Sequence, residues 1–175
     1  MGDDEAVLKA SIRDVPDFPK KGILFKDITT LLKDPKAFRL ATDRFVELIG
    51  TRPLDKVVAI ESRGFIFGSL AADRLGIGFV PVRKPGKLPW TTRRASYELE
   101  YGTDSLEIHD DALSAGEKVL VVDDVIATGG TAAAVGELVR GFGATVSAYA
   151  FLVELGFLDG RSKLAGSEIL TLIHY

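Results

Sequence analysis

The chain has 175 residues, of which 46% are hydrophobic and 27% charged, and its formal net charge at pH 7 is −3. This composition predicts one globular domain, residues 1–175, and it disfavours a general nucleic-acid-binding protein, because such proteins need a cationic surface to meet phosphates. The sequence contains no cysteine, so disulfide bonds and thiolate metal sites are excluded.

The N-terminal residues and the hydropathy pattern bear on location. The chain starts Met-Gly-Asp-Asp-Glu, and no uninterrupted apolar run approaches the roughly 18 residues of a membrane helix. We therefore expect no signal peptide and no membrane partner, and we expect a cytoplasmic protein.

Helices and strands are predicted to alternate from residue 34 onward. Asp34 before Pro35 is typical of a helix start, and an apolar face extends this helix to residue 49. The predicted elements that follow are a strand at 57–60, a helix at 65–75, strands at 79–82 and 119–122, a helix carrying Val135, Leu138, Val139 and Phe142, and a strand at 145–153. This order predicts an α/β fold, a parallel sheet with helices on both faces, in which ligands bind beyond the carboxyl ends of the strands.

The stretch "VLVVDDVIATGGTA", residues 119–132, joins a predicted strand to a predicted helix. Unpaired backbone N–H groups and the positive end of the helix dipole make such a junction suitable for a phosphate. Gly129 and Gly130 allow close approach of the backbone, and Thr128 and Thr131 add hydroxyl donors. The Gly-Lys-Thr ending of a Walker loop is missing. A helix cap with ordinary turn residues is the simpler alternative.

Asp123 and Asp124 in the same stretch are harder to explain as a cap. Adjacent carboxylates repel each other unless a cation or a group rich in hydroxyls lies between them. A sugar diol or a hydrated magnesium ion would satisfy this requirement.

A second candidate anion site follows the strand at 79–82. Arg83, Lys84 and Lys87 surround Pro85 and Gly86. Alone, this pattern is typical of a solvated loop, but beside a phosphate loop it favours a second anion site.

The stretch 119–132 resembles the phosphoribosyl-diphosphate signature of the type I phosphoribosyltransferases. Four more segments are similar to the adenine phosphoribosyltransferases within that family: "DFPKKGILFKDIT" (17–29), "ESRGFIFG" (61–68), "RKPGKLP" (83–89) and "YELEYG" (97–102). The resemblance implies the type I phosphoribosyltransferase fold, with a small N-terminal hood over about 1–34 and a flexible loop or hairpin over about 84–104. It also implies a cis peptide bond between Glu61 and Ser62.

The activity that the resemblance implies is transfer of the phosphoribosyl group from 5-phosphoribosyl 1-diphosphate to adenine, giving AMP and pyrophosphate. Magnesium is the implied cofactor, and a homodimer is the implied assembly. The resemblance implies these site residues: Ala127, Thr128, Gly129, Gly130 and Thr131 at the 5-phosphate; Asp123 and Asp124 at the ribose, with Asp123 also facing Mg²⁺ through water; Arg63, Arg83, Lys84 and Lys87 at the pyrophosphate, with Arg83 reaching across the dimer interface; and Leu24, Phe25 and Lys26 at adenine.

Phe25 and Glu100 illustrate how the resemblance changes the interpretation of single residues. Phe25 would more often lie in a core, whereas in the hood it can stack on a purine while backbone groups near Leu24 and Lys26 meet the base edge. Glu100 lies in an alternating segment whose polar residues would ordinarily face solvent. The resemblance instead implies that Glu100 is catalytic and holds or donates a proton at N7 of the purine. It gives no role for Trp90, Arg93 or Arg94.

Two alternatives remain at this stage. One is transfer to hypoxanthine, guanine or xanthine, although "FLVELGFLDG" (151–160) lacks the lysine that the relatives acting on 6-oxopurines use. The other is a regulatory protein that kept the sugar-phosphate site without catalysis. Such regulators carry an added DNA-binding domain, for which the 16 residues before "DFP" give no room.

Overall fold

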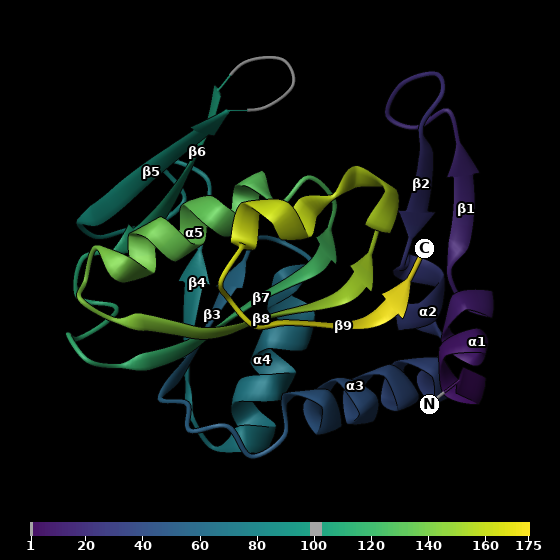
Figure 1. Cartoon of the computed structure of the whole chain (residues 1–175), viewed down its shortest axis with the longest axis horizontal. Helices are drawn as coiled ribbons and strands as arrows, with labels where there is room; N and C mark the ends of the chain where they lie inside the picture. The colour runs from purple at the N-terminus through teal and green to yellow at the C-terminus, as the bar shows by residue number, and fades with distance from the viewer. Residues whose placement is uncertain (1, 99–102) are drawn as a thin grey trace.

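The computed structural model describes residues 2–98 and 103–175, and a five-stranded parallel sheet lies at its centre (Figure 1). In spatial order the strands are β4 (Gly78–Val82), β3 (Lys56–Ile60), β7 (Lys118–Ile126), β8 (Thr145–Glu154) and β9 (Ile169–His174). The inner strands are almost continuously apolar and buried, as expected for a parallel sheet covered on both faces.

The two faces of the sheet have separate cores. On one face α3 (Pro35–Ile49) and α4 (Gly64–Leu75) cover alternate residues of β3, β7 and β8. On the other face α5 (Gly130–Arg140) packs with hairpin residues on the remaining side chains of the same strands. This arrangement confirms the predicted α/β sheet with helices on both sides.

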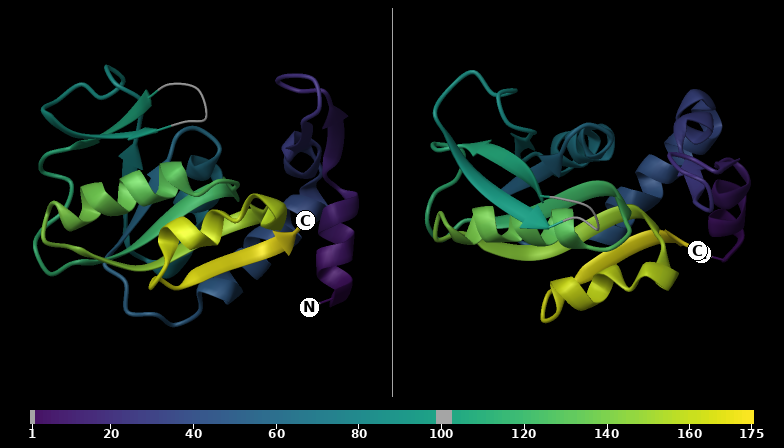
Figure 2. Two further views of the ribbon diagram at one scale, coloured as in Figure 1. Left: turned by 45° about the horizontal axis from the view of Figure 1, so that its top comes forward. Right: turned by 90° about the horizontal axis from the view of Figure 1, so that it is seen from above.

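The N-terminal elements form a unit that we call the hood. It consists of α1 (Gly2–Ala10), the antiparallel pair β1 (Arg13–Pro16) and β2 (Leu24–Asp27), and α2 (Thr29–Lys33). Contacts with the C-terminal segment hold it in place: the backbone N–H of His174 donates to Glu5 at 2.9 Å, and the Lys26 ammonium lies 3.9 Å from the centre of the Tyr175 ring. Figures 1 and 2 show the hood beside the end of β9.

A second antiparallel pair, the hairpin, lies on the α5 side of the sheet (Figure 2). It comprises β5 (Thr92–Glu98) and β6 (Thr103–His109), and in its register Tyr97 lies opposite Asp104. Two short 3-10 helices, Gly156–Leu158 and Gly160–Leu164, connect β8 to β9.

The predicted elements agree with the structure except near the motif and at Phe142, which lies beyond the end of α5 at Arg140. The helix predicted at 35–49 has those bounds, and Asp34 caps it by accepting from the N–H groups of Lys36 and Ala37. The strand predicted at 119–122 was too short: β7 continues to Ile126 because β8 pairs with it over that length, so both aspartates lie within the strand. The Glu61–Ser62 peptide bond is cis, as implied. Within the described part of the chain, no helix has the length and apolar character needed to span a bilayer.

Candidate active site

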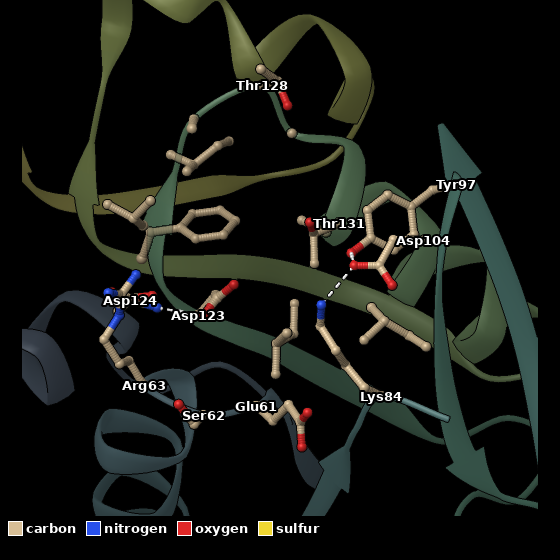
Figure 3. A pocket seen from close by; sticks show the side chains of 18 residues that line it. Glu61, Ser62, Arg63, Lys84, Tyr97, Asp104, Asp123, Asp124, Thr128 and Thr131 are labelled. Atoms are coloured by element: carbon tan, nitrogen blue, oxygen red, sulfur yellow. Dashed lines mark hydrogen bonds and ion pairs between the residues drawn. The ribbon is translucent and has the colours of Figure 1, made fainter. Parts of the chain in front are cut away.

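A pocket of about 360 Å³ opens where β3 and β7 end, between the start of α5 and the hairpin (Figure 3). Its lining combines the predicted phosphate loop, the acidic pair and one lysine of the basic segment. It therefore lies beyond the carboxyl ends of parallel strands, where the topology predicts a ligand.

The phosphate loop, residues 127–131, joins β7 to α5. Gly129 precedes the helix in a left-handed conformation with φ of 76°, and a Cβ there would lie 2.3 Å from the carbonyl oxygen of Gly160. Only glycine fits both restrictions. The loop thus presents the N-terminus of an 11-residue helix to the pocket, which is a suitable place for a phosphate. Four of the five predicted residues line the pocket, and Gly130 is the first residue of α5.

Asp123 and Asp124 both line the pocket but differ in their surroundings. Asp124 is 5% exposed and pairs with Arg63 at 2.6 Å, whereas Asp123 is half-buried. Desolvation, followed by the charge of Asp124, raises the pKa of Asp123 well above its usual range. An acid in this condition favours a cation or hydroxyl groups as its ligand.

Gly64 allows the start of α4 to lie close to the acidic pair on β7. A Cβ at this position, the first of α4, would lie 2.9 Å from both the Asp123 Oδ1 atom and the Val122 carbonyl oxygen. Because that space is filled by β7, a side chain there would push the start of α4 away from the acidic pair. Arg63, the residue before it, contacts Asp124.

The predicted pyrophosphate residues are only partly brought together. Arg63 and Lys84 line the pocket, whereas Arg83 and Lys87 are not part of its lining. The Arg83 guanidinium contacts Glu61 at 2.7 Å and donates to the Lys87 carbonyl oxygen at 3.1 Å.

Tyr97 and Asp104 are pocket residues that the sequence analysis missed. Asp104 accepts from Lys84 at 2.8 Å and from the Tyr97 hydroxyl at 3.3 Å. Desolvation raises the pKa of Tyr97. The alternating pattern of residues 97–101 was recognised, but finding this pair also required the register of the hairpin, in which Tyr97 faces Asp104.

The predicted adenine residues lie in the hood near a second cavity of about 350 Å³. Phe25 lines that cavity with Phe18, whose ring centre is 5.1 Å away in an edge-to-face contact, and with Arg63, whose guanidinium lies 5.3 Å from the Phe25 ring centre. Arg63 lines both cavities. Leu24 is 48% exposed, whereas the Lys26 ammonium contacts Asp14 at 2.7 Å. The charge of Lys26 is therefore already paired within the hood.

One predicted residue lies outside the described part of the chain, and one residue without a predicted role has an unpaired buried atom there. Glu100, the predicted catalytic residue, lies outside the described residues. His109, for which no role was predicted, has a buried Nε2 atom with no hydrogen-bond partner among the described residues.

Known proteins resemble the chain over nearly its full length. The family model for the phosphoribosyl transferase domain matches residues 27–165. The adenine phosphoribosyltransferase of Thermotoga neapolitana is 60% identical over 168 residues, which make up 96% of this chain and 99% of that protein.

Solved structures of adenine phosphoribosyltransferases are also similar to this chain. A crystal structure of adenine phosphoribosyltransferase from Thermoanaerobacter pseudethanolicus matches with a TM-score of 0.95 and 54% identity, covering 98% of this chain and 99% of that one. The Saccharomyces cerevisiae enzyme, complexed with an imino-altritol bisphosphate and adenine, matches with a TM-score of 0.91 and 44% identity over 99% of this chain and all of that one.

Proposed function

Because the chain belongs to the phosphoribosyl transferase family, as an adenine phosphoribosyltransferase, we propose that the pocket at the end of β7 is its active site. The activity is the salvage of a purine: adenine and 5-phosphoribosyl 1-diphosphate give AMP and pyrophosphate. The observation that carries the site assignment is that the phosphate loop and the acidic pair line one pocket.

In this proposal the sugar phosphate binds across the end of β7. The backbone N–H groups of residues 127–131 and the dipole of α5 bind the 5-phosphate, with the Thr128 and Thr131 hydroxyls as further donors. Asp123 and Asp124 accept hydrogen bonds from the ribose hydroxyls. Arg63 and Lys84 bind the diphosphate from inside the pocket.

Adenine binds on the hood side of the sugar. The Phe25 ring stacks on the base, and backbone groups near Leu24 and Lys26 meet its edge. The transition state resembles an oxocarbenium ion, so negative charge develops on the departing pyrophosphate while the base loses positive charge. We assign Glu100 to the base, where its carboxylate would accept the proton that leaves N7 as N9 bonds to the sugar carbon.

The residues present fit the magnesium ion that we propose as cofactor. Asp123 lines the pocket, and its pKa is raised by desolvation and by the nearby charge of Asp124. Asp124 is already paired with Arg63, so Asp123 is the carboxylate that we assign to the ion. No three acidic or histidine side chains among residues 2–98 and 103–175 gather into a metal site. Mg²⁺ does not require one, because it keeps several waters and binds through one or two carboxylates plus substrate phosphates. Held by Asp123 through water, it would neutralise charge on the diphosphate.

The assembly and the location are also part of the proposal. A homodimer in which Arg83 reaches the partner's pyrophosphate site would explain why Arg83 does not line its own pocket. A cytoplasmic location stays a prediction from the sequence.

A steady-state assay with phosphoribosyl diphosphate and each of adenine, hypoxanthine and guanine tests the function. We expect AMP formation from adenine and no comparable turnover of the two 6-oxopurines, because a base site built for an amino group leaves polar groups unpaired with an oxo group. Equal turnover of hypoxanthine would contradict the assignment.

A further inference from the structure

Three cations predicted to meet pyrophosphate are all paired with carboxylates of their own chain. Arg63 contacts Asp124 at 2.6 Å, Arg83 contacts Glu61 at 2.7 Å, and Lys84 contacts Asp104 at 2.8 Å. The Lys84 pair differs from the others because its carboxylate comes from the hairpin. Unlike Asp124, Asp104 also has no place in the proposed binding of sugar, metal or base.

The geometry of Asp104 fixes both of its oxygens. One accepts from the backbone N–H of Ser105 at 2.8 Å, and the other accepts from Lys84 and from the Tyr97 hydroxyl. Figure 3 shows the Lys84 side chain extended across the pocket toward Asp104 and Tyr97. The contact raises the pKa of Lys84 and lowers that of Asp104, so both groups are charged at neutral pH.

The pair is also accessible. The side chain of Lys84 is 56% exposed and that of Asp104 is 24% exposed, and both residues line the pocket. An ion pair in contact with solvent contributes little net free energy, so its partners can separate at low cost. A carboxylate at this position also disfavours an arriving anion unless a cation neutralises it.

We propose that Asp104 is an exchangeable counter-ion for Lys84, holding the ammonium group until the diphosphate takes it and reclaiming it as pyrophosphate leaves. This role rests on the proposed function, because it requires Lys84 to bind the diphosphate. Asp104 is then a positioning residue that weakens binding of the diphosphate and speeds release of the product.

A double-mutant cycle on pyrophosphate binding tests the exchange. The dissociation constant of inorganic pyrophosphate is measured by calorimetry, at a fixed Mg²⁺ concentration, for the parent, Asp104→Asn, Lys84→Gln and the double variant. The coupling in this cycle equals the change in the Lys84–Asp104 interaction on binding, because any direct repulsion between Asp104 and the ligand cancels.

Exchange predicts two results. Asp104→Asn binds pyrophosphate about two- to fivefold more tightly than the parent, the range of an exposed ion pair. Lys84→Gln loses about two- to fivefold more affinity in the Asp104→Asn background than in the parent background. Stopped-flow displacement should also show slower release of pyrophosphate from Asp104→Asn.

Asp110→Asn is the matched control. It removes the same charge next to the other end of the hairpin, where Asp110 accepts from the Thr91 hydroxyl at 2.8 Å, and it should leave pyrophosphate affinity unchanged. If the two substitutions have additive effects, the Lys84–Asp104 pair persists in the complex and the proposal is wrong. Unchanged or weaker pyrophosphate binding by Asp104→Asn would also overturn it. If the parent itself does not bind pyrophosphate, the proposed function fails and this inference with it.

Discussion

At the scale of single residues, the proposed mechanism depends most on Glu100. Replacing it with glutamine keeps the shape of the side chain but removes the group that holds the proton. We expect kcat to fall by about 10² to 10⁴, the usual contribution of general acid–base catalysis, with unchanged affinity for phosphoribosyl diphosphate. Steady-state kinetics with adenine and calorimetry with phosphoribosyl diphosphate measure the two quantities.

Glu98→Gln is the control for this change, because Glu98 lies two positions away in the same alternating segment. It should alter kcat little. Turnover at the parental rate by Glu100→Gln would make Glu100 a structural residue and leave catalysis to electrostatics and positioning.

Asp27 gives a residue-scale prediction on stability. One of its oxygens accepts from the N–H of Thr29 at 2.9 Å, and the other accepts from Arg13 at 3.1 Å. These contacts, chiefly the one with Arg13, lower the pKa of Asp27 to about 2. A carboxylate with a lowered folded-state pKa stabilises the fold above its usual pKa near 3.8 and loses this effect as the pH falls toward 2. Asp27→Asn should therefore lower the free energy of unfolding by about 1 kcal/mol at pH 7.

Urea unfolding at several pH values measures this effect. The difference between parent and Asp27→Asn should shrink as the pH falls from 4 to 2, whereas the exposed Asp111→Asn should differ from the parent by less than about 0.5 kcal/mol throughout. A difference that stays constant with pH would show that the charge of Asp27 is not what stabilises the hood.

At the scale of elements, the phosphate loop depends on a segment outside the pocket. A Cβ on Gly160 would lie 2.3 Å from the Ala127 carbonyl oxygen, just as one on Gly129 would meet Gly160. Gly160→Ala should therefore displace the loop and weaken binding of phosphoribosyl diphosphate at least about tenfold, since displacements of about 1 Å are costly in such sites.

Gly156→Ala is the control in the same connection, because its Cβ would make an ordinary contact at 3.4 Å with the Tyr175 carbonyl oxygen. Calorimetry measures the affinity of both variants for phosphoribosyl diphosphate. A loss in Gly160→Ala alone would be due to the contact with Ala127 and not to the added methyl group in general. Parental affinity in Gly160→Ala would show that the loop does not rely on this neighbour.

Local signals explain which elements could be predicted from the sequence. The helix at 35–49 was predicted with its observed bounds because Asp34, Pro35 and Gly50 mark its ends. The strand β9 was not predicted, because two short 3-10 helices join it to its pairing partner β8 in place of the α-helix that usually links parallel strands. The motif residues were predicted to share a pocket because they are adjacent in sequence, whereas the Lys84–Asp104 pair depends on how the hairpin packs.

At the scale of the whole molecule, Arg83 distinguishes a dimer that completes the site from one that does not. We expect sedimentation equilibrium to give about twice the 18.9 kDa mass of the chain. Co-expression of Arg83→Ala with Glu100→Gln should then restore about a quarter of parental activity, because half of the assemblies are mixed and each mixed dimer has one intact site.

Each variant alone is the control, and both should be nearly inactive. A fully active monomer would contradict the prediction. A dimer without restored activity would place Arg83 in its own subunit's site, where its contact with Glu61 already holds it.

The contacts between hood and β9 have a consequence for biosynthesis. Translation runs from the N-terminus, so the hood is made before its partners His174 and Tyr175. During elongation, Phe18 and Phe25 therefore leave the ribosome well before the C-terminal segment that contacts their unit. The unit in which we propose that adenine binds is therefore made before two of its contacts exist, and nascent chains stalled before residue 169 should have a more protease-sensitive N-terminal region than the finished chain.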